Sequence, residues 1–263
     1  MEILGYFLAL IMGFSLGLLG GGGSILTVPI LVYVLEIDPV KSTAYSLFVV
    51  GITALVGGWQ KHRQGLVMWR EGILFAIPSL TSVFLTRLYV VPAIPDTLFT
   101  YQDFTLTKPL FVMLFFAIIM LLAGGSMLKT SQKGSIAAPG KKINIPVIII
   151  DGIVVGTLTG IVGAGGGFLI VPALVILLKL PIKKAIGTSL IIIAIKSLSG
   201  FMGDIIQGNT MDWNLLAIFT VVAVLGMFVG LYVTRFVNQN HLKKIFGWFI
   251  ITFAAIMIIK ELL

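Results

Sequence analysis

Long apolar stretches separated by short polar breaks run along the whole chain. They cover about residues 3–35, 40–60, 72–92, 109–128, 146–178, 185–206, 214–236 and 245–262. A helix needs about 20 apolar residues to cross a hydrocarbon core, and most of these stretches are that long. The composition agrees, since 58% of the residues are hydrophobic and only 11% are charged. The pattern predicts an all-α polytopic membrane protein.

One glycine-rich stretch occurs twice, at residues 17–29 and again at residues 160–172, 143 positions later. The same offset continues downstream without a gap, so that Ser46 aligns with Ser189. A constant offset over segments of such different character is hard to obtain by chance. The chain therefore contains an internal duplication.

Each copy places a run of glycines inside an otherwise apolar segment, at residues 20–23 and 165–167. Glycine costs about 1 kcal/mol relative to alanine in a helix interior, so a helix break is expected at each run. Close packing of helices through small residues is the alternative, but it needs glycines on one face only. Residues 3–35 as one helix would be about 50 Å long, far more than a membrane core of about 30 Å.

The basic residues distinguish a single crossing from a hairpin at each glycine-rich element. If each element crosses once, lysine and arginine divide eight against nine between the two sides of the membrane. If each returns to its own side, they divide four against thirteen, as the positive-inside rule requires. We therefore predict re-entrant hairpins, six full crossings and both termini outside the cell.

Three full crossings in each half would invert the halves relative to each other. The predicted regions are a first transmembrane repeat (residues 1–128), a cytoplasmic linker (residues 129–144) and a second repeat (residues 145–263). Each repeat then has a Gly-rich broken or re-entrant helical element plus three transmembrane helices. Inverted repeats with interrupted helices at matching positions are typical of secondary transporters.

The helix breaks are candidate anion sites, because the first amides of a helix lack intrahelical partners and carry the positive end of its dipole. The alternative is that neighbouring helices satisfy these amides and nothing binds. The candidate residues are Gly22, Gly23 and Ser24 in the first half and Gly165, Gly166 and Gly167 in the second.

Hydroxyls and one lysine complete the candidate substrate site. Ser46, Thr188 and Ser189 lie in the segments that follow the breaks, where they bind either the ligand or the backbone of their own helices. Lys196 lies well inside an apolar segment, where a charge is costly and marks a functional site by default. Snorkelling, or a pair with Asp204, is the alternative for Lys196.

Several function classes are excluded or disfavoured by the sequence. The chain has no cysteine, no cluster of metal ligands in its apolar segments and neither an HExxH nor a GxSxG motif, so we expect no metal, no cofactor and no enzyme activity. The net charge of +8 lies in loops between apolar segments, so we expect the lipid bilayer and no nucleic acid as partner.

The two glycine-rich elements, each ended by a proline, resemble those of the TauE/SafE family of sulfite and organosulfur-anion exporters. The second half also suits the family with residues 187–189 (Gly-Thr-Ser), whereas the first half departs from it with residues 44–46 (Ala-Tyr-Ser). The resemblance implies transport of a small sulfur oxyanion or sulfonate, and we expect export of sulfite or an organosulfonate across the inner membrane. An anion channel and a non-transporting scaffold remain alternatives, and a homodimer is left open.

Overall fold

The computed structural model describes residues 2–101, 104–129, 145–176, 178, 180–208, 210–234, 236 and 239–262. The first half contains α1 (Glu2–Leu19), the 3₁₀ turn η1 (Gly22–Leu26), α2 (Thr27–Tyr33), α3 (Pro39–Arg63), α4 (Trp69–Leu85), the π-helical turn η2 (Thr86–Val90), α5 (Val91–Ala93), β1 (Thr97–Tyr101), β2 (Phe104–Thr107) and α6 (Lys108–Lys129). The second half contains α7 (Ile145–Val162), α8 (Gly167–Ile176), α9 (Ile182–Ile206), α10 (Trp213–Val233) and α11 (Gln239–Leu262). Except for Lys129, the predicted linker lies outside the described residues.

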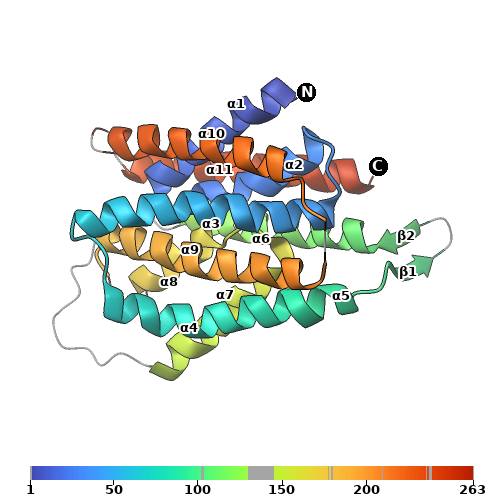
Figure 1. Cartoon of the computed structure of the whole chain (residues 1–263), viewed down its shortest axis with the longest axis horizontal. Coiled ribbons are helices and arrows are strands. Elements are labelled where there is room, and N and C mark those ends of the chain that lie inside the picture. The colour runs from blue at the N-terminus through green and yellow to red at the C-terminus, as the bar shows by residue number, and fades with distance from the viewer. Residues whose placement is uncertain are drawn as a thin grey trace.

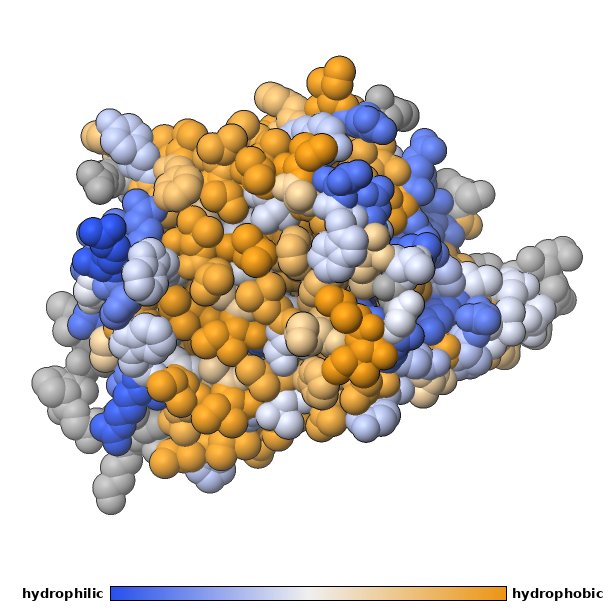
Figure 2. Space-filling model, in the orientation of Figure 1, coloured by the Kyte–Doolittle hydropathy of each residue, from blue (hydrophilic) through white to orange (hydrophobic). Residues whose placement is uncertain are grey.

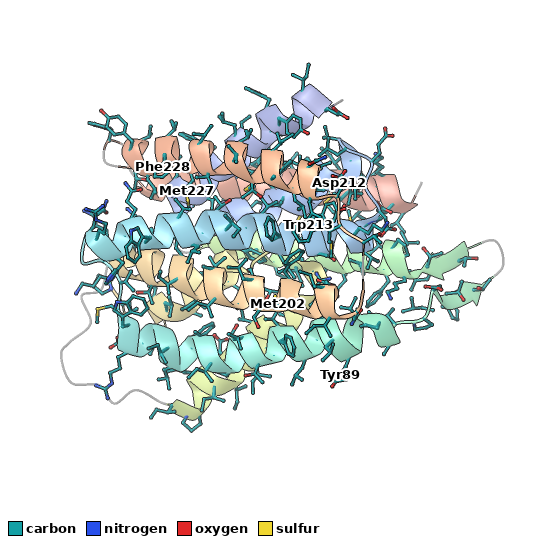
Figure 3. The ribbon with its side chains drawn as sticks, in the orientation of Figure 1. Tyr89, Met202, Asp212, Trp213, Met227 and Phe228 are labelled. Atoms are coloured by element: carbon teal, nitrogen blue, oxygen red, sulfur yellow. The ribbon has the colours of Figure 1, made fainter. Side chains whose placement is uncertain are left out.

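Within the described part of the chain, seven helices are long and apolar enough to cross a membrane: α1, α3, α4 with its continuation to Ala93, α6, α7, α9 and α10. Figure 2 shows hydrophobic side chains over the middle of the molecule and hydrophilic ones gathered toward its left and right ends. Exposed apolar side chains such as Met202 and Phe228 face outward from the helices (Figure 3). The prediction of a polytopic helical membrane protein is confirmed.

Helix boundaries follow local sequence signals. Asp38 caps α3, since its Oδ1 accepts hydrogen bonds from the amides of Val40 (2.9 Å) and Lys41 (3.0 Å), and Pro39 occupies the first helical position. Asp212 caps α10 in the same way, by accepting from the amide of Leu215 at 3.0 Å. These caps end the polar breaks that the hydropathy pattern marks.

The helices of the two halves have matching bounds and matching neighbours. Helix α7 begins and ends 143 positions after α1, and α9 does so after α3. Helix α1 packs against α10 and α7 packs against α4, while α3 packs against α9 and α6 against α11. In Figure 1, the first turn of α1 and the last turn of α11 lie toward the same end of the molecule. The core of the bundle thus forms where α3 and α9, each 25 residues long, run side by side.

A small β-hairpin extends beyond the bundle, next to α5 (Figure 1). Strands β1 and β2 pair antiparallel, with Thr97 opposite Thr107 and Tyr101 opposite Phe104. The hydropathy pattern marks this region only as a polar break, so the hairpin was not predicted.

Candidate anion-binding site

Helix α1 stops at Leu19, and two glycines turn the chain before helical structure resumes at Gly22. Gly20 has a φ of 65° and Gly21 a φ of 137°, values that residues with a Cβ rarely adopt. The hydroxyl of Ser24 donates to the carbonyl of Gly21 at 2.7 Å, which helps to hold the turn. Beyond it, η1 and α2 together form one short apolar helical segment, Gly22–Tyr33.

The second half is interrupted at the equivalent place. Helix α7 ends at Val162, and the break before α8 contains three glycines with positive φ: Gly163 (72°), Gly165 (63°) and Gly166 (66°). The carbonyl of Gly166 accepts hydrogen bonds from the amides of Leu169 and Ile170, both at 3.0 Å, which starts α8. Glycine is needed here because of this backbone conformation.

The two breaks touch each other in the middle of the fold. A Cβ added to Gly21 would lie 2.6 Å from the Cα of Gly167, and Gly167 is held as closely against Gly21. Neither position has room for a side chain. The starts of η1 and α8, which are 145 positions apart in the chain, therefore come together at this crossing.

Lys196 of α9 reaches the second break. Its side chain is fully buried, and its Nζ donates to the hydroxyl of Thr159 on α7 at 2.7 Å. A Cβ on Gly166 would lie only 2.7 Å from the same Nζ, so the ammonium lies directly against the glycine turn. Among the residues that the structure describes, no carboxylate forms an ion pair with Lys196.

Lys196 and its partner Thr159 have no equivalent lysine and threonine at the aligned positions of the first half. The repeat aligns Lys196 with Thr53 and Thr159 with Leu16. Thr53 donates to the carbonyl of Val49 in its own helix at 2.6 Å, and among the described residues it forms no hydrogen bond to another element. Sequence reasoning missed Thr159, although its alignment with an apolar residue was a usable signal, the same one that distinguishes Lys196.

The two aligned serines have different surroundings. Ser189 donates to the carbonyl of Gly20 at 2.7 Å and to that of Ile186 at 2.9 Å, so it ties α9 to the first break. Ser46 is fully buried, and its hydroxyl has no hydrogen-bond partner within the described part of the structure. An unpaired buried hydroxyl is costly, and a ligand oxygen that accepted from Ser46 would remove that cost. Ser46 is therefore a candidate ligand donor.

The other predicted site residues are distributed around the breaks. A Cβ on Gly23 would lie 2.7 Å from the carbonyl oxygen of Met12, so Gly23 packs against α1. Gly22 is buried in η1. A Cβ on Gly165 would lie 3.5 Å from the hydroxyl of Ser197, which has no partner in the described residues.

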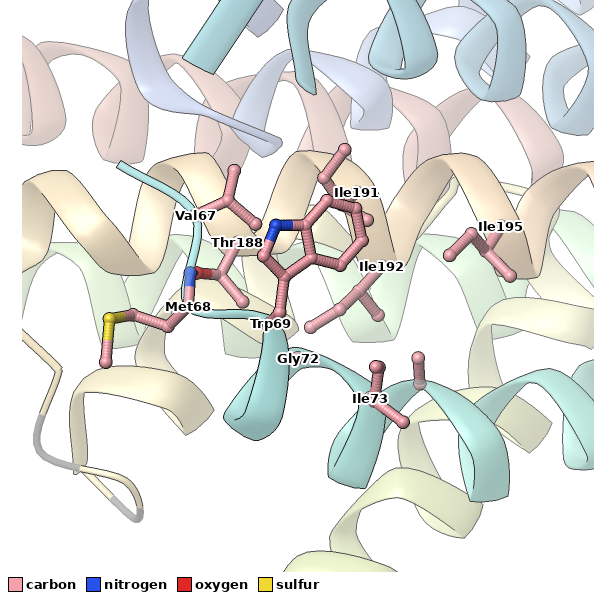
Figure 4. Close-up of a pocket in the computed structure, with 10 residues that line it drawn as sticks. Val67, Met68, Trp69, Gly72, Ile73, Thr188, Ile191, Ile192 and Ile195 are labelled. Atoms are coloured by element: carbon pink, nitrogen blue, oxygen red, sulfur yellow. The ribbon is translucent and has the colours of Figure 1, made fainter. Parts of the chain in front are cut away.

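Thr188 faces away from this group, toward α4. Its hydroxyl accepts from the amide of Met68 at 2.9 Å (Figure 4). Around it lies a cavity of about 20 Å³, lined by residues of α4, α9 and the segment before α4. A volume of that size holds about one water molecule and no larger ligand. The structure does not bring Thr188 together with Lys196.

A second buried charge was missed at the sequence level. Arg87 in η2 is fully buried, and its Nη1 lies 3.4 Å from Oδ1 of Asp204 on α9. The sequence places Asp204 near the end of its segment, where it predicts an interfacial cap or a carrier of a coupling proton, with a pair to Lys196 as the competing view for the lysine. Arginine next to a helix end gives no signal of burial, and the pair joins positions 117 apart.

Comparison with known proteins identifies the family. A probable membrane transporter protein of Xylella fastidiosa (strain 9a5c) is 31% identical over 94% of this chain and 91% of its own length. A probable membrane transporter protein of Haemophilus influenzae is 28% identical over 94% of both chains, and the probable membrane transporter protein YunE of Bacillus subtilis is 29% identical over 78% of both. No solved structure gives a significant match. The chain matches the family described as sulfite exporter TauE/SafE over residues 6–257, and it belongs to that family of membrane transporters.

Proposed function

We propose that this protein is a secondary transporter that exports a small anion, sulfite or an organosulfonate, through a site between the two glycine breaks. The observation that carries the proposal is the fully buried ammonium of Lys196, whose partner is a hydroxyl and which lies against the turn at Gly166. The substrate-binding residues are Gly22, Gly23, Ser24, Ser46, Gly165, Gly166, Gly167 and Lys196 from the sequence, and Thr159 from the structure, whereas the hydroxyl of Ser189 holds the first break through the carbonyl of Gly20. Thr188 serves the packing of α4 on α9 instead.

Electrostatics favour an anion next to Lys196. An ammonium inside a membrane protein is costly unless it is paired, and the hydroxyl of Thr159 supplies no charge. A sulfite oxygen at about 4 Å would supply about 4 kcal/mol of Coulomb attraction at an effective dielectric near 20. The amides at the start of α8 add the positive end of a helix dipole at the same place.

The hydroxyl of Ser46 is a candidate donor from the other half, on the part of α3 that contacts the second break through Thr43 at Gly163 and Val50 at Gly165. It is buried and unpartnered among the described residues, while Gly21 and Gly167 bring the two halves into contact. A sulfur oxyanion has three or four oxygens, so it can accept from a hydroxyl, an ammonium and backbone amides at once. The site would then be built from both halves and would change when they move relative to each other.

The proposed topology has inverted halves, with residues 1–128 and 145–263 as the two repeats in the inner membrane. In Figure 1, α2 returns toward the end from which α1 starts, and α8 returns toward the start of α7 at the opposite end. Two hairpins that enter from opposite sides leave six full crossings, with both termini outside. Without Arg87, which is buried, the lysines and arginines divide three against thirteen, and this division supports the orientation.

The test is uptake by purified protein in proteoliposomes, with sulfite, thiosulfate, sulfate, sulfoacetate and chloride as probes. We expect saturable sulfite or sulfonate flux and accelerated exchange when the same anion is loaded on both sides, which a channel does not give. Flux that does not saturate would support an anion channel. No flux, together with no thermal stabilisation by any of the five anions, would overturn the proposal in favour of a scaffold.

A further inference from the structure

The buried pair of Arg87 and Asp204 is incompletely formed. One contact joins the two groups, at 3.4 Å, although arginine and carboxylate can form two parallel hydrogen bonds. Nε and Nη2 of Arg87 and Oδ2 of Asp204 are buried and have no hydrogen-bond partner within the described residues. Two donors of a guanidinium are thus left open inside the protein.

The pair lies on the same helix face as the candidate anion site. Lys196, Gly200 and Asp204 are spaced by four residues, so they follow one another along one side of α9. The distance from Lys196 to Asp204 is about 12 Å along the helix axis. A Cβ on Gly200 would lie 3.1 Å from Cδ1 of Leu47, 3.2 Å from Cγ2 of Val83 and 3.8 Å from Cγ of Arg87, so the arginine side chain packs on α9 at Gly200 together with these two side chains.

The backbone around Arg87 is adapted to hold this side chain. Arg87 lies in the π-helical turn η2, a form that is rare and frequently found at functional sites. The side-chain amide of Gln207 donates to the carbonyls of Arg87 (2.7 Å) and Leu88 (2.9 Å), which braces the turn against the end of α9. A Cβ on Gly160 would lie 2.8 Å from Cβ of Thr86, so η2 also packs against α7 next to Thr159.

We propose that Arg87 is a second anion station and that Asp204 is its gate, a proposal that rests on the transport function above. In the conformation described here, Asp204 contacts the guanidinium of Arg87 through one pair of atoms, Oδ1 and Nη1. When a sulfur oxyanion passes between the Lys196 site and the nearby end of α9, it accepts from the open Nε and Nη2 and competes with the carboxylate for the charge of Arg87. The planar fork of guanidinium donors matches two oxygens of such an anion.

The anion and the carboxylate of Asp204 compete for Arg87, so the two members of the ion pair have different roles. The charge of Asp204 repels an anion and neutralises Arg87, so it keeps the path closed when no substrate is present. Arg87 attracts the anion and compensates for its lost hydration. A pair that only held α4 to α9 would gain from a second hydrogen bond, and here the donors for that bond stay open.

The proposal predicts opposite effects from two substitutions that break the same ion pair. The readout is the KM for sulfite uptake by the full-length protein in proteoliposomes. We expect Asp204→Asn to lower KM about fivefold or more, because Arg87 is freed, and Arg87→Gln to raise it about tenfold or more. KM values that move in the same direction would overturn the gate, because a purely structural pair is damaged equally by either change.

A double variant keeps the test valid if a single variant fails to fold. Replacing both members of a buried pair by apolar residues is often neutral for stability, so Arg87→Met with Asp204→Leu is expected to melt near the wild-type temperature. We expect it to raise KM as Arg87→Gln does, whereas a wild-type KM would overturn the proposal. Wild-type protein that moves none of the five anions would overturn the transport function and the gate together, and sulfite flux without the predicted KM shifts would overturn the gate alone.

Discussion

The hydroxyl of Ser189 donates to the carbonyl of Gly20 at 2.7 Å and so joins the two halves of the duplicated chain. The aligned serine of the first half, Ser46, is equally buried, but its hydroxyl has no partner within the described structure. One serine therefore serves the fold, and the other is available to a ligand. Because Ser46 and Ser189 are aligned in the duplication, a substitution at one serine is a control for the same substitution at the other.

Alanine at the two serines is expected to separate stability from binding. Ser189→Ala leaves the carbonyl of Gly20 without its donor and should lower stability by about 1 kcal/mol. Ser46→Ala removes no hydrogen bond, so the melting temperature should stay within error while affinity for sulfite falls. Melting curves with and without sulfite measure both effects. Equal destabilisation by both substitutions would contradict the assignment of Ser46 to the site.

The glycine break at Gly166 is expected to tolerate no methyl group. Alanine there meets the ammonium of Lys196 and takes a φ of 66°, a left-handed conformation that costs about 1–2 kcal/mol. We predict that Gly166→Ala abolishes sulfite uptake while the protein still inserts into the membrane. The matched control is Gly125→Ala in α6, where an added Cβ meets no atom within 4 Å. Uptake that survives in Gly166→Ala would show that the break is only a spacer.

Much of the fold follows from the sequence because membrane helices are long, apolar and separated by charge. The constant offset of 143 predicted equivalent helices, and the bounds of α1 and α7, like those of α3 and α9, repeat it. The glycine runs predicted where the first helix of each half stops, since residues with a Cβ rarely take the positive φ found at Gly20 and Gly163. The inverted orientation of the halves remains a prediction.

The contacts within the site could not be predicted in the same way. The bond between Lys196 and Thr159 joins α9 to α7, and nothing in either segment's periodicity determines which helix faces are in contact. The pair of Arg87 and Asp204 joins a π-helical turn to α9. Such contacts depend on how helices pack, which hydropathy and spacing leave open.

Two aligned lysines test the inverted topology. Lys41 near the start of α3 and Lys184 near the start of α9 occupy the same place in the two halves. The chain has no cysteine, so Lys41→Cys and Lys184→Cys each give a single label site. We expect an impermeant thiol reagent to label Lys41→Cys in intact cells and Lys184→Cys only after lysis. Labelling of both from outside would mean parallel halves and would refute the hairpins.

The Lys196 ammonium is expected to contribute mainly to anion affinity. Lys196→Met keeps the apolar stem and removes the charge, and the hydroxyl of Thr159 loses its donor. Desolvation of the ammonium offsets part of the Coulomb attraction, so we predict that sulfite affinity falls by one to two orders of magnitude, or about 1.4–2.8 kcal/mol. Lys196→Arg keeps the positive charge and should restore part of the affinity. The restoration stays incomplete because the guanidinium is larger and planar and fits poorly against Gly166.

The readout is the dissociation constant for sulfite, measured on the same preparations as the melting temperature. The control is Thr53→Met, at the aligned position of the first half, where the lost hydroxyl bonds only to its own helix and affinity should stay within twofold, well under 1 kcal/mol. Unchanged affinity in Lys196→Met, with equal or higher stability, would remove Lys196 from the site and leave its burial as a matter of packing.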